Sequence, residues 1–261
     1  MVATVGSALP RFEAVTPATL KLALRRGWHD LRRAPLYALV LAGVYVAMGW
    51  IMVWVTRATG QTYWLVLAAV GFPLIAPFCA VAFYEISRRL AGGAPLEWGG
   101  ITGVVLHQAR GQLPYVGGAM LVVFLCWFFL GHMIFAIFLG LSPMTNISHS
   151  LDVFLTPEGL MMLAVGSVVG AGFATLLFMV TVLSMPLLLD RDVDFMTAMI
   201  TSFAYVRDHA AVMFGWAAFI AVVTFVSMLP GFFGLFVTLP LLGHATWHLY
   251  ALLAEPDQRA G

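Results

Sequence analysis

The sequence predicts an all-α, polytopic transmembrane bundle of six helices, arranged as three helical hairpins that are each preceded by an amphipathic cytoplasmic helix. Composition is the first reason, because 62% of the 261 residues are hydrophobic and only 10% are charged. Soluble domains carry roughly 45–50% apolar and about 25% charged residues. This chain therefore cannot coat a soluble globule of its size, which excludes a soluble enzyme. Six long apolar runs and a one-sided distribution of basic residues are the other two reasons.

Each long apolar run is long enough to cross the membrane, because a helix needs about 20 mostly apolar residues to span the ~30 Å hydrocarbon core. The six predicted spans are Leu36–Val55, Tyr63–Ile86, Tyr115–Leu141, Leu160–Leu189, Ala210–Leu229 and Gly231–Leu253. Residues 16–253 then form a single six-span membrane domain. We expect residues 1–15 to be a flexible cytoplasmic N-terminus and residues 254–261 to be a cytoplasmic C-terminal tail.

The basic residues fix the predicted orientation of these spans. Of the 13 lysine and arginine residues, only Arg57 falls in a connection on one side, so the other 12 lie on the opposite side. Basic residues collect in cytoplasmic loops of membrane proteins. We therefore predict a multi-pass membrane protein with both termini in the cytoplasm.

Three segments are predicted to form cytoplasmic helices before the odd-numbered spans: Thr16–Ala34, Trp98–Gln112 and Asp194–His209. In the first, Thr16 suits an N-cap and Pro17 the first helical turn. A stripe of apolar side chains is expected to face lipid, namely Leu20, Leu24, Trp28 and Leu31. The opposite face is basic, and a basic side chain near an anionic bilayer contributes about 1 kcal/mol. Membrane lipids with anionic headgroups are thus the predicted partners, whereas the net charge of +1 gives no reason to expect nucleic acid binding.

Polar residues gather at the cytoplasmic ends of the even-numbered spans. His244 and His248 are four residues apart and share one helix face, a spacing with which imidazoles can chelate a metal ion. If the three hairpins surround a common axis, these ends converge. The sequence then predicts one cytoplasmic polar cluster, made of Glu85, Arg88, Asp190, Asp192, His244 and His248. It is either a structural network that anchors helix ends or a site for a metal or an anionic ligand. No cofactor is predicted.

Four segments carry a resemblance that covers about residues 20–253: Gly27–Leu31, Tyr84–Leu90, Pro186–Asp194 and Pro240–Tyr250. With these segments the chain resembles a family of bacterial integral membrane proteins of unknown function. The resemblance implies six spans in a bacterial inner membrane and implies no reaction. Some members of that family carry the label cytochrome c oxidase subunit I. The catalytic subunit of that enzyme needs about a dozen spans and about six ligating histidines. This chain has six predicted spans, and only His132, His244 and His248 of its seven histidines fall within them. We therefore do not expect an oxidase catalytic subunit.

No recognisable catalytic motif is present in the sequence. We see no nucleophile paired with a base, no phosphate-binding loop and no dinucleotide fingerprint. Proton-coupled transporters usually keep an ionisable side chain at mid-membrane, and no Asp, Glu, Lys or Arg falls centrally in a predicted span. We therefore expect a non-enzymatic scaffold or accessory factor that acts through its cytoplasmic face, with an unidentified membrane protein as partner. A small transporter or channel is the alternative.

Overall fold

The computed structural model describes residues 9–60, 63–140 and 151–254, with the backbone alone for residues 63–75 and 151–152. Within these ranges the chain is mostly helical, and Phe12 and Ala254 form an isolated antiparallel β-bridge. The helices are α1 (Pro17–Arg33), α2 (Pro35–Thr59), α3 (Tyr63–Ala91), α4 (Trp98–Ala109), α5 (Leu113–Leu139), α6 (Pro157–Thr181), α7 (Ser184–Asp190), α8 (Phe195–Asp208), α9 (Ala210–Met228) and α10 (Leu235–Leu253), with a short 3₁₀ turn at Leu151–Leu155.

Four helical stretches among the described residues are long and apolar enough to cross a membrane: Pro35–Thr59, Leu113–Leu139, Pro157–Asp190 and Ala210–Met228. Their outer surfaces carry large exposed apolar side chains, among them Trp54, Phe129 and Val168. This exposure suits a surface in contact with lipid. The all-α class is therefore confirmed, whereas the exact number of six spans stays a prediction. The two other predicted spans correspond to α3 and α10, which are not among these four stretches. Helix α3 ends in charged residues, and α10 carries two histidines.

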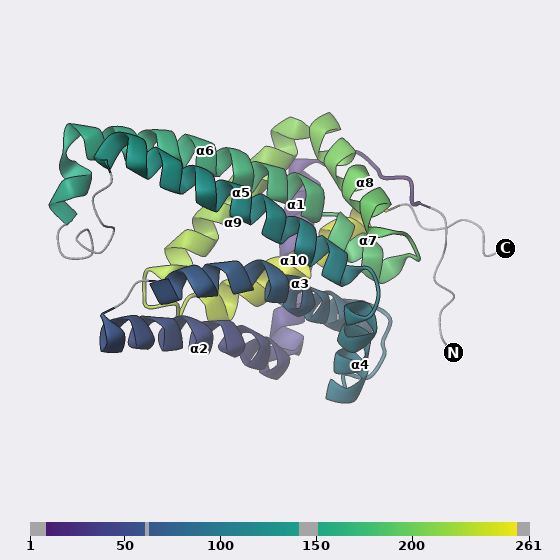
Figure 1. The fold of residues 1–261 in the computed structure, drawn as a ribbon. Coiled ribbons are helices and arrows are strands. Elements are labelled where there is room, and N and C mark those ends of the chain that lie inside the picture. The colour runs from purple at the N-terminus through teal and green to yellow at the C-terminus, as the bar shows by residue number, and fades with distance from the viewer. Residues whose placement is uncertain (1–8, 61–62, 141–150, 255–261) are drawn as a thin grey trace.

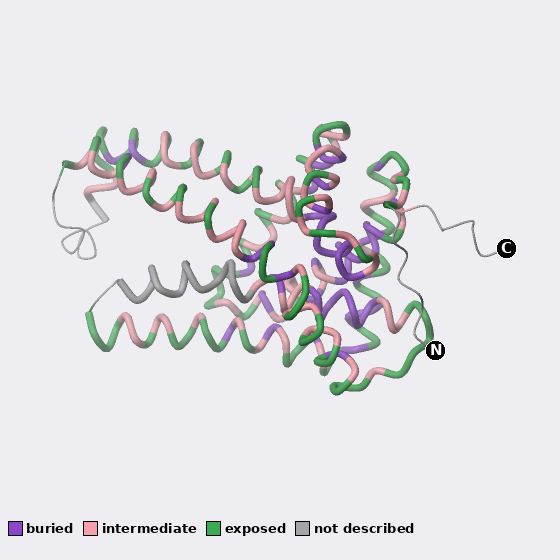
Figure 2. Tube along the Cα trace, turned by 45° about the vertical axis from the view of Figure 1, so that its right-hand side comes forward, coloured by how far each residue is buried: buried purple, intermediate pink, exposed green. Residues whose placement is uncertain are grey.

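Helix α10 is the centre of the molecule and packs against α1, α2, α3, α7 and α9. Helix α1 lies across α10, while α5 and α6 lie side by side and extend away from this centre (Figure 1). The buried residues concentrate where α10 meets the shorter helices, and the long helices become more exposed away from it (Figure 2). The core therefore sits at the end of the bundle that also holds α4, α7 and α8.

Helix α1 begins as the sequence predicts, because the Thr16 hydroxyl accepts a hydrogen bond from the backbone N–H of Thr19 at 3.1 Å. Its apolar stripe is placed differently. Leu31 is buried together with Ala23, Gly27 and Asp30, and this face packs on α10. The expectation of a stripe wholly in lipid was therefore wrong for Leu31. Trp28 remains exposed.

The predicted span Leu160–Leu189 is divided into α6 and α7 by a break at Val182 and Leu183. Pro186 explains the position of the break, because proline has no N–H to donate four residues back and its ring crowds that carbonyl. The side chain of Ser202 on α8 satisfies backbone groups that the break leaves without a partner in the helix. The buried Ser202 hydroxyl accepts from the Leu183 N–H at 3.1 Å and donates to the Met179 carbonyl at 2.7 Å.

Part of the N-terminal segment belongs to the packed body. The backbone N–H of Glu13 donates to the Leu253 carbonyl at 2.8 Å, and the Phe12 ring packs edge-on against Tyr205 and Tyr250. The expectation of a flexible segment over residues 1–15 therefore does not hold for residues 12–15. Residues 1–8 and the tail 255–261 lie outside the described residues.

Candidate functional site

A buried, hydrogen-bonded pair of side chains joins α1 to α10. The Asp30 Oδ2 and His248 Nε2 atoms lie 2.6 Å apart, and both side chains are buried. The pair can form because Gly27, one turn before Asp30, lets the two helices approach closely. Burial by itself would raise the pKa of Asp30, but the hydrogen bond and charge of His248, aided by the Ser87 hydroxyl, hold the pKa of this carboxyl below its ordinary value of 3.8.

The second histidine of α10 contacts α3 instead. His244 Nδ1 lies 2.8 Å from the Ser87 Oγ atom, and the Phe83 ring packs edge-on against the imidazole at 5.5 Å between centroids. The other ring nitrogen, Nε2, is buried and has no hydrogen-bond partner among the described residues. His244 and His248 therefore share one face of α10 but are held by different helices.

Glu85 forms a separate group near the end of α3. Its carboxylate is buried and accepts a hydrogen bond at 2.7 Å from each of two arginines on the same helix, Arg88 and Arg89. These positions are three and four residues later, which places all three side chains on one face. Arg89, which is not one of the six residues of the predicted cluster, is thus a partner of Glu85 beside Arg88.

Asp190, at the end of α7, contacts neither histidine. It accepts a hydrogen bond from the Tyr250 hydroxyl at 2.7 Å and from the Arg191 guanidinium at 3.1 Å. Asp192 is exposed in the connection that follows. Five of the six residues of the predicted cluster are thus distributed over separate groups of contacts: the two histidines with Asp30 and Ser87, Glu85 with Arg88, and Asp190 with Tyr250. Asp192 is in none of these groups, so the six residues do not form one connected cluster.

Asp30, Ser87 and Tyr250 are not among the six residues of the predicted cluster. Of these three, Asp30 is the one whose burial the sequence pattern indicates most clearly, because it lies three residues after Gly27 and seven after Ala23. That spacing repeats along one face of a helix, so Asp30 is the single carboxylate on the small-residue face of α1. A carboxylate at such a position needs a buried partner.

The contacts of the two histidines join α10 to α1 and α3. Among the described residues, no group of three or more His, Cys, Asp or Glu side chains could hold a metal ion. Nε2 of His248 bonds to Asp30 and Nδ1 of His244 bonds to Ser87. Each histidine therefore already uses one ring nitrogen for the contact between helices.

A groove lies beside this network, between α1, α9 and α10. It has a volume of about 410 Å³ and is lined by Lys21, Leu24, Arg25, Trp28, Phe219 and Leu241. Both cations and the exposed Trp28 come from α1, whereas α9 and α10 supply apolar side chains. The groove is thus lined by apolar side chains and by two basic residues.

Comparison with known proteins supports the membrane assignment. Residues 65–190, slightly under half of the chain, match the family described as "Predicted integral membrane protein (DUF2189)". This is a family of unknown function. No curated protein and no solved structure gives a significant match to the chain.

Proposed function

We propose that this integral membrane protein is a non-enzymatic scaffold or accessory factor whose cytoplasmic face holds an anionic lipid headgroup. The observation that carries the proposal is the groove of α1. Lys21 and Arg25 stand beside Trp28 and other apolar side chains, which is the combination that a lipid phosphate and its first acyl carbons require.

The anchoring of α1 supports this role. A basic helix that only rested on the bilayer would bind headgroups without fixing their position. Here one face of α1 is buried on α10, and the Asp30–His248 pair holds it there. The two cations therefore keep a constant position relative to the bundle. A lipid bound between them would join a fixed part of the protein to the leaflet and could support a partner protein.

If the groove binds an anionic headgroup, the protein should prefer phosphatidylglycerol to phosphatidylcholine, and this preference should depend on Lys21 and Arg25. The double variant Lys21→Gln/Arg25→Gln should bind phosphatidylglycerol about ten- to thirtyfold more weakly, since each cation contributes about 1 kcal/mol. Native mass spectrometry of the full-length protein in detergent, titrated with phosphatidylglycerol or phosphatidylcholine, measures this change. The double variant Arg32→Gln/Arg33→Gln removes the same charge from exposed positions of α1 that do not line the groove. Equal losses in both variants would reject the groove as the site.

The proposal also includes a topology of six spans in three hairpins, in a bacterial inner membrane, with both termini in the cytoplasm. The split of 12 basic residues against one supports this orientation. Reporter fusions at Gly92 and Gly261 should then be active in the cytoplasm, and fusions at Thr59 and Ser148 in the periplasm. A periplasmic reporter at Gly261 would contradict the orientation and would place the groove on the other side of the membrane.

A further inference from the structure

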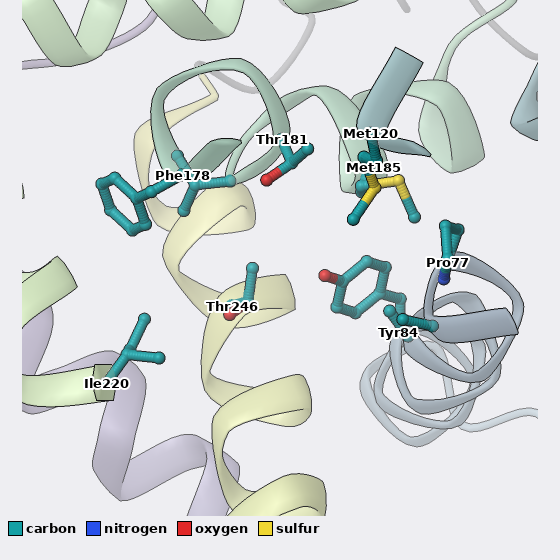
Figure 3. A pocket seen from close by; sticks show the side chains of 11 residues that line it. Pro77, Tyr84, Met120, Phe178, Thr181, Met185, Ile220 and Thr246 are labelled. Atoms are coloured by element: carbon teal, nitrogen blue, oxygen red, sulfur yellow. The ribbon is translucent and has the colours of Figure 1, made fainter. Parts of the chain in front are cut away.

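A second cavity lies inside the bundle, where α3, α5, α6, α7, α9 and α10 meet. Its volume is about 210 Å³ and it is open on one side. Apolar side chains form most of its wall, including Met120, Phe178, Met185 and Ile220 (Figure 3). It shares no lining residue with the groove of α1, so it is a separate candidate site.

The polar side-chain groups that line this cavity are hydroxyls. They differ in whether they can still donate a hydrogen bond to a ligand. Thr181 donates to the Leu177 carbonyl at 2.6 Å and Thr246 donates to the Leu242 carbonyl at 2.8 Å. Both oxygens can therefore only accept from a ligand. The Tyr84 hydroxyl has no hydrogen bond within the described part of the chain, and it points toward the space between the two threonines (Figure 3). It is a free donor on a largely buried side chain.

We propose that this cavity binds the hydroxyl end of an uncharged lipid. A ligand hydroxyl can accept from Tyr84 and donate to a threonine oxygen, and so satisfies both kinds of group at once. A charged headgroup does not fit, because no Asp, Glu, Lys, Arg or His lines the cavity. Unpaired charge in such surroundings would be costly.

The size and place of the cavity indicate that it holds one end of a longer molecule. Pockets that enclose a whole drug-sized ligand usually measure about 300–1,000 Å³, more than the 210 Å³ found here. The lining residues lie at the end of the bundle that holds α7 and the packed core. The hydroxyl would therefore sit near the depth of the headgroups, with the hydrocarbon chain extending into the bilayer.

The test uses a photoreactive oleyl alcohol on the full-length protein in detergent, with crosslinked peptides identified by mass spectrometry. Unlabelled oleyl alcohol should compete for labelling of α3 and α6 better than octadecene, which has no polar group, or oleate, which is charged. Tyr84→Phe should weaken the binding of oleyl alcohol about fivefold, since one hydrogen bond is lost. Oleyl alcohol should then compete no better than octadecene. Tyr115→Phe changes an exposed tyrosine outside the cavity and should have no effect.

A second variant, which fills the cavity, tests whether the labelling comes from a lipid bound inside it. Ala80→Leu places extra carbon atoms inside the cavity and should abolish labelling of its lining while leaving surface labelling unchanged. Competition by octadecene equal to that of oleyl alcohol in the unaltered protein would overturn the proposal, as would unchanged labelling in Ala80→Leu. Failure here leaves the anionic groove intact, since the two sites share no residue.

Discussion

Replacing Asp30 with alanine is expected to destabilise the protein by about 3 kcal/mol, because removal of one partner from a buried hydrogen bond to a carboxylate leaves the other polar group without compensation. His248 Nε2 would lose its 2.6 Å contact and remain buried between α1 and α10. In a domain of this size, that loss corresponds to a melting temperature lower by about 6–12 °C. Thermal unfolding of the purified protein in detergent, followed by tryptophan fluorescence, measures the change. Asp30→Asn should cost less, since its amide oxygen still accepts a hydrogen bond.

The contribution of Asp30 should also depend on pH. Its pKa is lowered in the folded protein, so its stabilising effect is present above the ordinary value of 3.8 and is lost as pH falls through the lowered value. The difference in stability between the unaltered protein and Asp30→Ala should therefore shrink as the pH falls below 3.8. Asp208→Ala, which removes an exposed carboxylate, is the matched control and should change stability by less than about 0.5 kcal/mol. Equal melting temperatures for the two variants would show that the buried pair does not hold α1.

The fold class and the positions of the helices follow from local patterns that the sequence displays directly. The segment predicted at Thr16–Ala34 is the helix Pro17–Arg33, and that at Asp194–His209 is Phe195–Asp208. Apolar run length, an N-cap and an early proline are enough for this. The break before Ser184 is less visible, because its position depends on Pro186 and also on Ser202 from another helix.

The contacts of the site could be predicted only in part, for a physical reason. Glu85 with Arg88 is a pair within one helix, so spacing alone indicates it. The partner of His248 depends on which helix crosses α10, and nothing in the local sequence states that α1 does. Repeat symmetry suggested that the ends of even-numbered spans meet one another. Instead, α1 occupies the face of α10 that carries His248, so that His248 bonds to Asp30 while Asp190 bonds to Tyr250.

Replacing Gly27 with alanine is expected to separate α1 from α10. A Cβ atom at this position would lie 2.8 Å from the backbone nitrogen of Ala245 and 3.0 Å from the carbonyl oxygen of Leu241. Backbone atoms of a packed helix cannot rotate aside as a side chain can, so α1 itself must shift. Overpacking of this kind typically costs about 1–3 kcal/mol, and the shift should also lengthen the Asp30–His248 contact. Gly27→Val, with two more methyl groups, should cost more than Gly27→Ala.

Gly215 provides the matched control for this change, because a Cβ atom there would meet nothing within 4 Å. Alanine is a better helix former than glycine by about 1 kcal/mol, so Gly215→Ala in α9 should leave the melting temperature unchanged or raise it, whereas Gly27→Ala should lower it. Opposite signs for the same chemical change would show that close approach, and not helix propensity, decides the outcome at Gly27. If Gly27→Ala were as stable as Gly215→Ala, α1 would not be in close contact with α10, and the groove of Lys21 and Arg25 would lose its fixed position.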